Sequence, residues 1–180
     1  LLNAFYGVMN NPWFRIQRVD LGDFVATKGR EIIQSLIEEM RKLGFEVIYG
    51  DTDSIFVILP EELTEDMIFA IEEEINDLFQ SKYGKNFQLE ADKLFSALYF
   101  PKRAGDDTAS KKKYAGYKIW ERGKGFIEPE LEIVGFEAIK GDTPESAKTL
   151  QKELIRMFLS GKTIEEIKAF VEDYKRNFLN

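Results

Sequence analysis

The sequence contains no cysteine and no histidine. These absences exclude disulfide frameworks, thiolate nucleophiles, imidazole bases and conventional zinc sites from the 180 residues. There is also no run of about eighteen apolar residues that could cross a membrane. The first residues, LLNAFYGVMNN, lack the order of charged, apolar and small residues that marks a signal peptide. We therefore expect a soluble, cytoplasmic protein whose chemistry depends on carboxylates, lysines, hydroxyls or a bound hard cation.

The charge of the chain is unevenly distributed. The net charge of -7 argues against a polyanionic partner, because binding to phosphates is driven by counterion release from a basic surface. Between Lys102 and Lys124, however, eight basic residues stand against three acidic ones, a net charge of +5. This stretch is the strongest candidate for an anion-binding surface.

The composition, 44% hydrophobic and 32% charged, is that of one ordinary globular domain. The sequence lacks an initiator methionine, and its first residues are already apolar. We expect it to be a piece of a longer protein.

Local patterns in the first third predict two helices and a hairpin. Residues 1–9 resemble the end of a helix that closes near Asn10. Asp20 is placed to cap a long helix that runs to about Leu43, with apolar residues at helical spacing and Gly44 to end it. Residues 45–50 and 54–59 then predict two strands joined across the turn DTDS.

The remaining two thirds alternate between predicted helices and strands. Thr64 is placed to cap a helix to about Ser81, and Thr143 with Pro144 to start another that ends near Leu159. Thr163 and Glu166 form a capping box for a last helix. Strands are predicted over 87–92, 94–100, 111–120 and 131–139. The order predicts an α+β fold, an antiparallel sheet covered by helices, followed by the start of a helical subdomain near 141–143.

Two aspartates, Asp51 and Asp53, lie one residue apart in the segment YGDTDSIFV. Successive side chains of a strand point to opposite faces, so the two carboxylates share a face if extended geometry persists through the turn. Their repulsion is relieved by a raised pKa or by a bound cation, and Mg²⁺ suits one or two carboxylates together with water and phosphate oxygens. The alternative is that Asp51 and Thr52 are simply turn formers.

Three short motifs occur in an order that resembles one protein family. YGDTDS resembles motif C of family B DNA polymerases, NAFYG at 3–7 resembles the end of motif B, and SKKKYAG at 110–116 resembles the Lys-any-Tyr element that grips the primer strand. GFEAIKGDTPESAK resembles the end of the palm that leads into the thumb. The resemblance is closest to the polymerase II-like and archaeal branch. It implies the end of the fingers at 1–18, a palm at 19–142 and the start of a thumb at 143–180.

The resemblance implies specific roles for residues of this chain. Asp53 would be a direct ligand of the catalytic Mg²⁺ ions, two in the complete enzyme, and Asp51 a supporting carboxylate. These ions serve the attack of a primer 3′-hydroxyl on a dNTP. Asn3, Tyr6 and Gly7 would contact the incoming nucleotide and the forming base pair. The residues implied to bind primer-template DNA are Lys112 and Tyr114, with Lys111 and Lys113 beside them. Without the resemblance, a run of lysines is equally well a solvated edge.

The sequence also departs from the complete family pattern. The lysine that begins motif B is absent, and so is motif A, which supplies the other metal-binding aspartate. We therefore expect an excised segment or a split subunit that is inactive alone and needs the remainder of the polymerase as its partner, with self-association of the isolated fragment at its unpaired apolar surface. One alternative is a non-catalytic DNA-binding or assembly module derived from a polymerase. Another is an autonomous transferase, for which Glu90 and Asp92 are the only further acidic pair on a predicted strand.

Overall fold

The computed structural model describes residues 2–15, 17–51, 53–102, 105 and 109–178, and only the backbone of 2–5 and 178. The chain divides into two compact units, Leu1–Glu61 and Glu62–Asn180. Each unit contains helices and its own antiparallel sheet, which confirms the predicted α+β class. Among the helices of the described part, none has the length and apolar character needed to cross a membrane.

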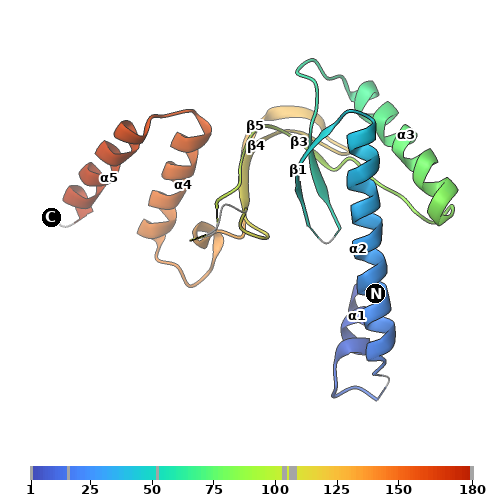
Figure 1. Ribbon diagram of the computed structural model, residues 1–180. Coiled ribbons are helices and arrows are strands. Elements are labelled where there is room, and N and C mark those ends of the chain that lie inside the picture. The colour runs from blue at the N-terminus through green and yellow to red at the C-terminus, as the bar shows by residue number, and fades with distance from the viewer. Residues whose placement is uncertain (1, 16, 52, 103–104, 106–108, 179–180) are drawn as a thin grey trace. The chain divides into compact units, whose positions relative to one another are not determined.

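Two antiparallel helices begin the first unit, α1 (Leu2–Asn10) and α2 (Val19–Lys42) (Figure 1). Both predicted helices are confirmed. The Asn10 side chain packs so closely on Gly22 that a Cβ there would lie 2.1 Å from its Oδ1. Asp20 does not cap α2, contrary to the prediction. It lies inside the first turn and pairs with Arg18 at 2.7 Å, where its charge still favours the positive end of the helix dipole.

A hairpin follows α2 and folds back along it. The strands β1 (Glu46–Gly50) and β2 (Ile55–Ile58) pair antiparallel, with Gly50 opposite Ile55, which confirms the predicted pair of strands. Tyr49 and Phe56 pack edge to face with their ring centroids 5.8 Å apart. Gly50 lies against α2, where a Cβ would be 3.4 Å from Cδ1 of Ile37. The helix therefore supports the end of the hairpin.

The second unit begins with α3 (Glu65–Tyr83), whose N-terminus is capped as predicted. Oγ1 of Thr64 accepts a hydrogen bond from the Met67 backbone at 3.3 Å. The sheet of this unit has the order β3-β4-β5, built from Lys93–Tyr99, Tyr114–Glu121 and Gly125–Val134. The side chains of Glu65 and Phe69 tie α3 to this sheet: Trp120 Nε1 donates to Glu65 at 3.1 Å, and the Trp120 ring packs edge to face on Phe69.

The predicted strand over 87–92 is wrong. The segment forms no strand, and side chains of α3 bond to three of its backbone groups instead. Asn76 donates to the carbonyl of Leu89 and accepts from its N–H, both at 2.8 Å, and Glu72 accepts from the N–H of Ala91 at 2.7 Å. The amide of one asparagine thus replaces a strand neighbour. The acidic pair Glu90 and Asp92 does not lie on a strand.

The last strand also differs from its prediction. β5 begins at Gly125 rather than near 131 and ends at Val134, and residues Glu137–Ile139 form a short 3₁₀ helix, η1. Pro129 lies inside β5. Because proline is rare within strands, the sequence pattern did not predict the first half of β5. A proline is tolerated there because β5 is an edge strand and its pairing with β4 is irregular between Lys118 and Trp120.

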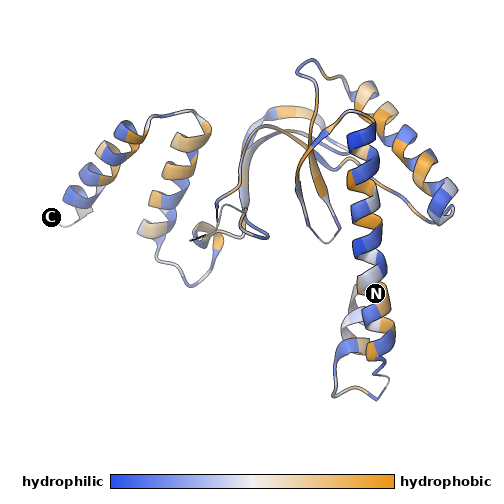
Figure 2. Cartoon of the chain, viewed as in Figure 1, coloured by the Kyte–Doolittle hydropathy of each residue, from blue (hydrophilic) through white to orange (hydrophobic). Residues whose placement is uncertain are grey.

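Two helices close the second unit, α4 (Glu145–Leu159) and α5 (Ile164–Phe178). Pro144 is the N-cap of α4 and not its first helical residue as predicted, because its carbonyl accepts the first helical bond, from Lys148 at 3.0 Å. The predicted capping box of α5 is confirmed by reciprocal bonds of 2.8 and 3.2 Å between Thr163 and Glu166. Figure 2 shows the hydrophobic residues of both helices gathered along one side. Ile155 of α4 packs with Ala115 and Phe136 in the core.

Replacing Asn76 by alanine tests the side-chain ladder beside α3. Asn76→Ala removes two hydrogen bonds and leaves the part-buried N–H and C=O of Leu89 without partners. We expect the free energy of unfolding in urea to fall by about 2–3 kcal/mol. The neighbouring exposed residue supplies the control, Asp77→Ala, which should cost less than about 0.5 kcal/mol. Equal stabilities of the two variants would contradict this arrangement.

Candidate functional site

The predicted carboxylate turn occupies residues 51–54, between β1 and β2. The Asp51 N–H donates to the Ser54 carbonyl at 2.9 Å and closes the turn. Extended geometry ends at Gly50 and resumes at Ile55, so strand alternation does not carry through the turn to set the faces of the two aspartates. Asp51 is half-buried and Asp53 is exposed. Thr52, predicted as a turn former, lies outside the described residues.

The Asp53 carboxylate has no hydrogen-bond or ion-pair partner among the residues that the structure describes. No lysine or arginine of the described part neutralises its charge. Carboxylate oxygens are the ligands that Mg²⁺ prefers, so the donor chemistry at this turn fits that ion. Within the described ranges, however, no group of three or more acidic side chains is placed to hold a metal ion. The turn can supply one or two ligands, and the others would come from water, substrate or another segment.

The motif B residues are carried by α1, in the same unit as the turn. Tyr6 is 39% exposed and Gly7 is exposed, with open space around it. Asn3 belongs to α1, but its side chain lies outside the described residues. The α1 contact at Gly22 and the hairpin contact at Ile37 are fifteen residues apart on α2, about 22 Å along the helix axis. One helix therefore sets the spacing between the two predicted groups.

The three consecutive lysines of the Lys-any-Tyr element form a turn before β4, which we call the lysine turn (Lys111, Lys112 and Lys113). Lys111 and Lys112 are exposed and Lys113 is half-buried. Lys112 has φ 58, the left-handed region that costs a residue with a side chain about 1–2 kcal/mol. Gly135, with φ 74, comes so close that a Cβ would lie 2.1 Å from the Lys112 carbonyl oxygen. Only glycine fits at position 135, and its close contact with the Lys112 carbonyl helps to keep the Lys112 backbone in this strained conformation.

Tyr114 is the first residue of β4 and is firmly held. Its ring packs near those of Phe95 and Phe100, with centroid distances of 6.0 and 6.3 Å. Its hydroxyl donates to Oε1 of Glu132 at 3.0 Å. Burial, and then the bond to Glu132, raises the pKa of Tyr114 to about 12. The side chain therefore remains a neutral donor throughout the neutral range.

A buried charge network on the sheet was missed by the sequence prediction. Lys118 is only 6% exposed and lies 2.8 Å from Glu121, 3.1 Å from Glu130 and 3.7 Å from Glu132. Hydrogen bonds from Lys118 and Lys124 lower the pKa of Glu121 to about 2. The sequence did carry a signal. Lys118 has the same strand parity as Gly116 and Trp120, which are buried.

This network reduces the basic surface that the sequence appears to offer. Lys118 forms ion pairs with glutamates of the sheet, and Lys124 pairs with Glu121 at 2.9 Å. The Arg122 guanidinium lies 5.5 Å from the Phe69 ring centroid, donates to the Ala91 carbonyl at 3.0 Å and pairs with Glu72. The lysine turn is thus the more accessible part of the basic stretch.

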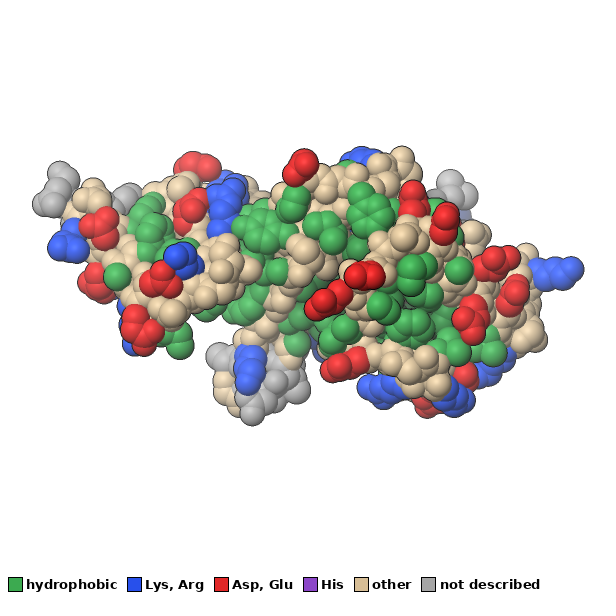
Figure 3. Space-filling model, turned by 90° about the horizontal axis from the view of Figure 1, so that it is seen from above, with side chains coloured by type: hydrophobic (Ala, Val, Ile, Leu, Met, Phe, Trp, Pro, Cys, Tyr) green, Lys and Arg blue, Asp and Glu red, His purple; other side chains and the backbone are tan. Residues whose placement is uncertain are grey.

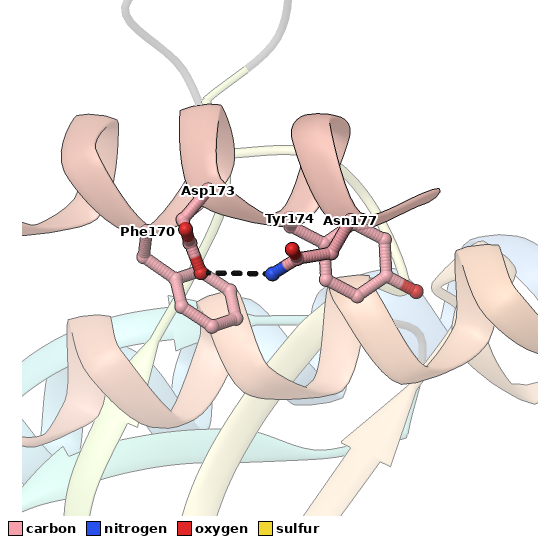
Figure 4. A pocket seen from close by; sticks show the side chains of 4 residues that line it. All are labelled: Phe170, Asp173, Tyr174 and Asn177. Carbon is pink, nitrogen blue, oxygen red and sulfur yellow. Dashed lines mark hydrogen bonds between the residues drawn. The ribbon is translucent and has the colours of Figure 1, made fainter. Parts of the chain in front are cut away.

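The hollow in Figure 4 lies elsewhere. Its lining residues come from α5: Phe170, Asp173, Tyr174 and Asn177, around a volume of about 350 Å³. Asn177 donates to Asp173 at 3.1 Å, and the Tyr174 hydroxyl donates to the Ser146 carbonyl of α4 at 2.9 Å. The bond from Tyr174 joins the two helices, and none of the predicted site residues lines the hollow.

Comparisons with known proteins agree with the motifs. A family model described as DNA polymerase family B matches residues 1–179. DNA polymerase 2 of Aeropyrum pernix is 33% identical over 179 residues, which are 99% of this chain and 19% of that protein. DNA polymerase II of Escherichia coli is 31% identical over 168 residues, covering 88% of this chain and 21% of that protein.

A solved structure gives the same result. The family B DNA polymerase from the hyperthermophilic archaeon Pyrobaculum calidifontis matches with a TM-score of 0.64 at 27% identity, covering 98% of this chain and 19% of that one. The chain belongs to DNA polymerase family B. It spans about a fifth of the length of the relatives described here. The assignment of its segments to fingers, palm and thumb stays a prediction.

The low pKa of Glu121 predicts a dependence of stability on pH. A carboxyl whose folded-state pKa lies below its ordinary value of 4.5 stabilises the fold above that value and loses this contribution as the pH falls toward 2. We expect Glu121→Gln to be less stable than the parent protein at pH 7, with a difference that shrinks between pH 5 and pH 2. Urea unfolding across this range measures it. If the difference in stability between Glu121→Gln and the parent protein does not change with pH, Glu121 is not paired with Lys118 and Lys124 as described.

Strain at Lys112 is tested by a pair of variants that both remove its charge. At φ 58, glycine avoids the steric cost that alanine retains. Lys112→Gly should therefore be more stable than Lys112→Ala by about 0.5–1 kcal/mol. Thermal and urea unfolding provide the comparison. If alanine proves the more stable of the two, Lys112 is not held in the left-handed region.

Proposed function

We propose that this chain is part of the catalytic region of a DNA-directed DNA polymerase that adds dNTPs to a primer 3′ end. The observation that carries the proposal is the exposed Asp53 carboxylate, without a partner among the described residues, on the YGDTDS turn of a chain that matches the family along its length. In nucleotidyl transfer the protein mainly positions charged groups and neutralises them, so a carboxylate left without a cationic neighbour has a use there.

Asp53 and Asp51 are the residues that would hold Mg²⁺. When bound, divalent cations of this kind activate the attacking hydroxyl and stabilise the leaving pyrophosphate. The backbone bond from Asp51 to Ser54 keeps the turn tight, and Gly50 seats it on α2. The backbone from which the Asp53 side chain projects is thereby fixed. Asp51, which is half-buried, would be the supporting carboxylate.

The exposed groups of α1 and the lysine turn would contact the substrates. Tyr6 and Gly7 present a ring and an open backbone, a combination that tests the shape of a base pair without reading its sequence. Asn3 would orient the nucleotide. Lys112, with Lys111 and Lys113 beside it and Tyr114 behind it, would contact the primer strand, since lysine makes sequence-independent phosphate contacts.

The partners we propose are primer-template DNA, a dNTP and the remainder of a polymerase, a chain or segment that carries motif A. Large apolar side chains of the first unit are exposed, including Trp13 at 91% and Phe24 at 59%. Hydrophobic side chains also occupy much of the face shown in Figure 3. Such exposure is typical of a surface that packs against other protein, and in the isolated chain it would promote self-association.

The 180 residues by themselves should not extend a primer, because the turn that carries Asp51 and Asp53 supplies only part of a two-metal site. A chimera gives the positive test. These residues would replace the matching segment of DNA polymerase 2 of Aeropyrum pernix. In that chimera we expect Asp53→Asn to lower the rate of primer extension by about 10²–10³-fold, the loss typical of removing a group that stabilises the transition state.

The matched control in the same unit is Asp23→Asn, an exposed aspartate of α2, which should extend primers at the parent rate. Two results would count against the proposal: an Asp53→Asn chimera as fast as the control, or robust extension by the isolated 180 residues. Salt-sensitive binding of primer-template DNA that persists in Asp53→Ala, with no loss of extension in the chimera, would favour a non-catalytic DNA-binding module.

A further inference from the structure

The Tyr114 hydroxyl has one proton, and that proton is directed into the protein. It donates to Oε1 of Glu132 at 3.0 Å. Phosphate oxygens only accept hydrogen bonds, so a tyrosine that binds a DNA phosphate has to donate the same proton. Bonds to an ionised acceptor are roughly twice as strong as bonds between neutral groups. A phosphate therefore competes for this donor against a carboxylate that is already in place.

Glu132 is itself fixed as a charged acceptor. Lys93 donates to the same Oε1 at 2.9 Å, and Lys118 lies 3.7 Å from Oε2. Glu132 pairs with Gly116 across the ladder between β4 and β5. Its position thus follows from sheet register and from two cations, independently of Tyr114. It can act as an anchor for the tyrosine.

The same strand end also holds the lysine turn. Gly135 follows Glu132 by three residues and touches the Lys112 carbonyl, while Tyr114 follows Lys112 by two residues and is bonded to Glu132. The ring of Tyr114 is enclosed by Phe95 and Phe100. The strained turn is therefore held at Lys112 by Gly135, just after β5, and at Tyr114 by Glu132 of β5, while the Lys112 side chain is exposed.

We propose that Glu132 is a positioning residue for the DNA contact. It holds the hydroxyl of Tyr114 within the protein, Tyr114 fixes the lysine turn, and the phosphate contact is made by Lys112. The part that concerns DNA rests on the proposed function. The part that concerns the turn does not, and the two parts have separate readouts.

The turn is tested without DNA. Three variants of the 180-residue protein remove the charge-assisted bond: Tyr114→Phe deletes the donor, Glu132→Gln removes the charge of the acceptor, and the double variant does both. The control is Glu128→Gln, an exposed glutamate of the same strand. Tyrosine ring signals in NMR titrations should show the pKa of Tyr114 falling from about 12 toward its ordinary value of 10.0 in Glu132→Gln but not in Glu128→Gln.

The amide signals of the lysine turn should also move in the same direction in Tyr114→Phe and in Glu132→Gln. Tyr114→Phe leaves every charge in place, so it remains informative if Glu132→Gln unfolds. An unchanged pKa of Tyr114 in folded Glu132→Gln would overturn the proposal. So would lysine-turn amides that do not respond to Tyr114→Phe.

Binding of primer-template DNA over a series of salt concentrations tests the contact itself. Tyr114→Phe, Glu132→Gln and the double variant should each weaken binding by a similar factor, about 2- to 10-fold, because all three lose the same charge-assisted hydrogen bond. Their dependence of affinity on salt should match that of the parent. Lys112→Ala should instead reduce the salt slope by about 1, as the loss of one phosphate contact requires.

A direct phosphate contact by Tyr114 predicts the opposite pattern. Tyr114→Phe would then weaken binding, whereas Glu132→Gln would leave it unchanged or tighten it by releasing the hydroxyl, and this result would overturn the proposal. If the parent protein binds no primer-template DNA, that result counts against the proposed function. The role of Glu132 in holding the turn is then decided by the NMR readouts alone.

Discussion

The proposed chemistry depends on one carboxylate, Asp53, whose charge no described residue of its own unit neutralises. In the second unit, acidic groups of the sheet have nearby cations: Lys118 serves Glu121, Glu130 and Glu132, and Lys93 serves Glu132 again. Asp53 has no such neighbour among the described residues. The turn that carries it is closed by a backbone bond and supported by α2, so the exposed charge is held in place by the fold.

The two units support their predicted contacts by different means. In the first, α2 provides a rigid support for both α1 and the hairpin, and regular secondary structure positions the groups. In the second, the lysine turn is irregular. It depends on the close approach of Gly135 and on the hydrogen bond of Tyr114 to Glu132. Strained backbone of this kind persists only where its surroundings over-determine it, and functional sites are where it tends to occur.

Local signals in the sequence predicted local structure well. The cap at Thr64, the capping box at Thr163 and the hairpin around the DTDS turn are confirmed, because each depends on residues within a few positions of one another. Two of the errors came from parts of the chain that are distant in sequence, and one came from a local competitor. Asn76 replaced a strand neighbour for 87–92, and Pro129 concealed a strand that its edge position tolerates. At Asp20, a competing arginine two residues away took the carboxylate.

The candidate site was predictable to a similar degree. Motifs identified Asp53, Tyr6 and the lysine turn as candidates, but nothing in three consecutive lysines shows that Lys112 is the one with positive φ. That property comes from Gly135, more than twenty residues away. The burial of Lys118 could have been inferred from its parity with Trp120 on β4. Two of its three carboxylates, Glu130 and Glu132, required the register of β5, which begins earlier than its pattern suggests.

The most direct measurement of the central claim is Mn²⁺ titration of the isotope-labelled protein, followed by paramagnetic broadening of its amide signals. Mn²⁺ prefers the same oxygen ligands as Mg²⁺. The account predicts that broadening begins at residues 50–55, and that Asp53→Asn abolishes it there while Asp23→Asn does not. Broadening centred on the glutamates of β5, or unaffected by the loss of the Asp53 charge, would contradict it.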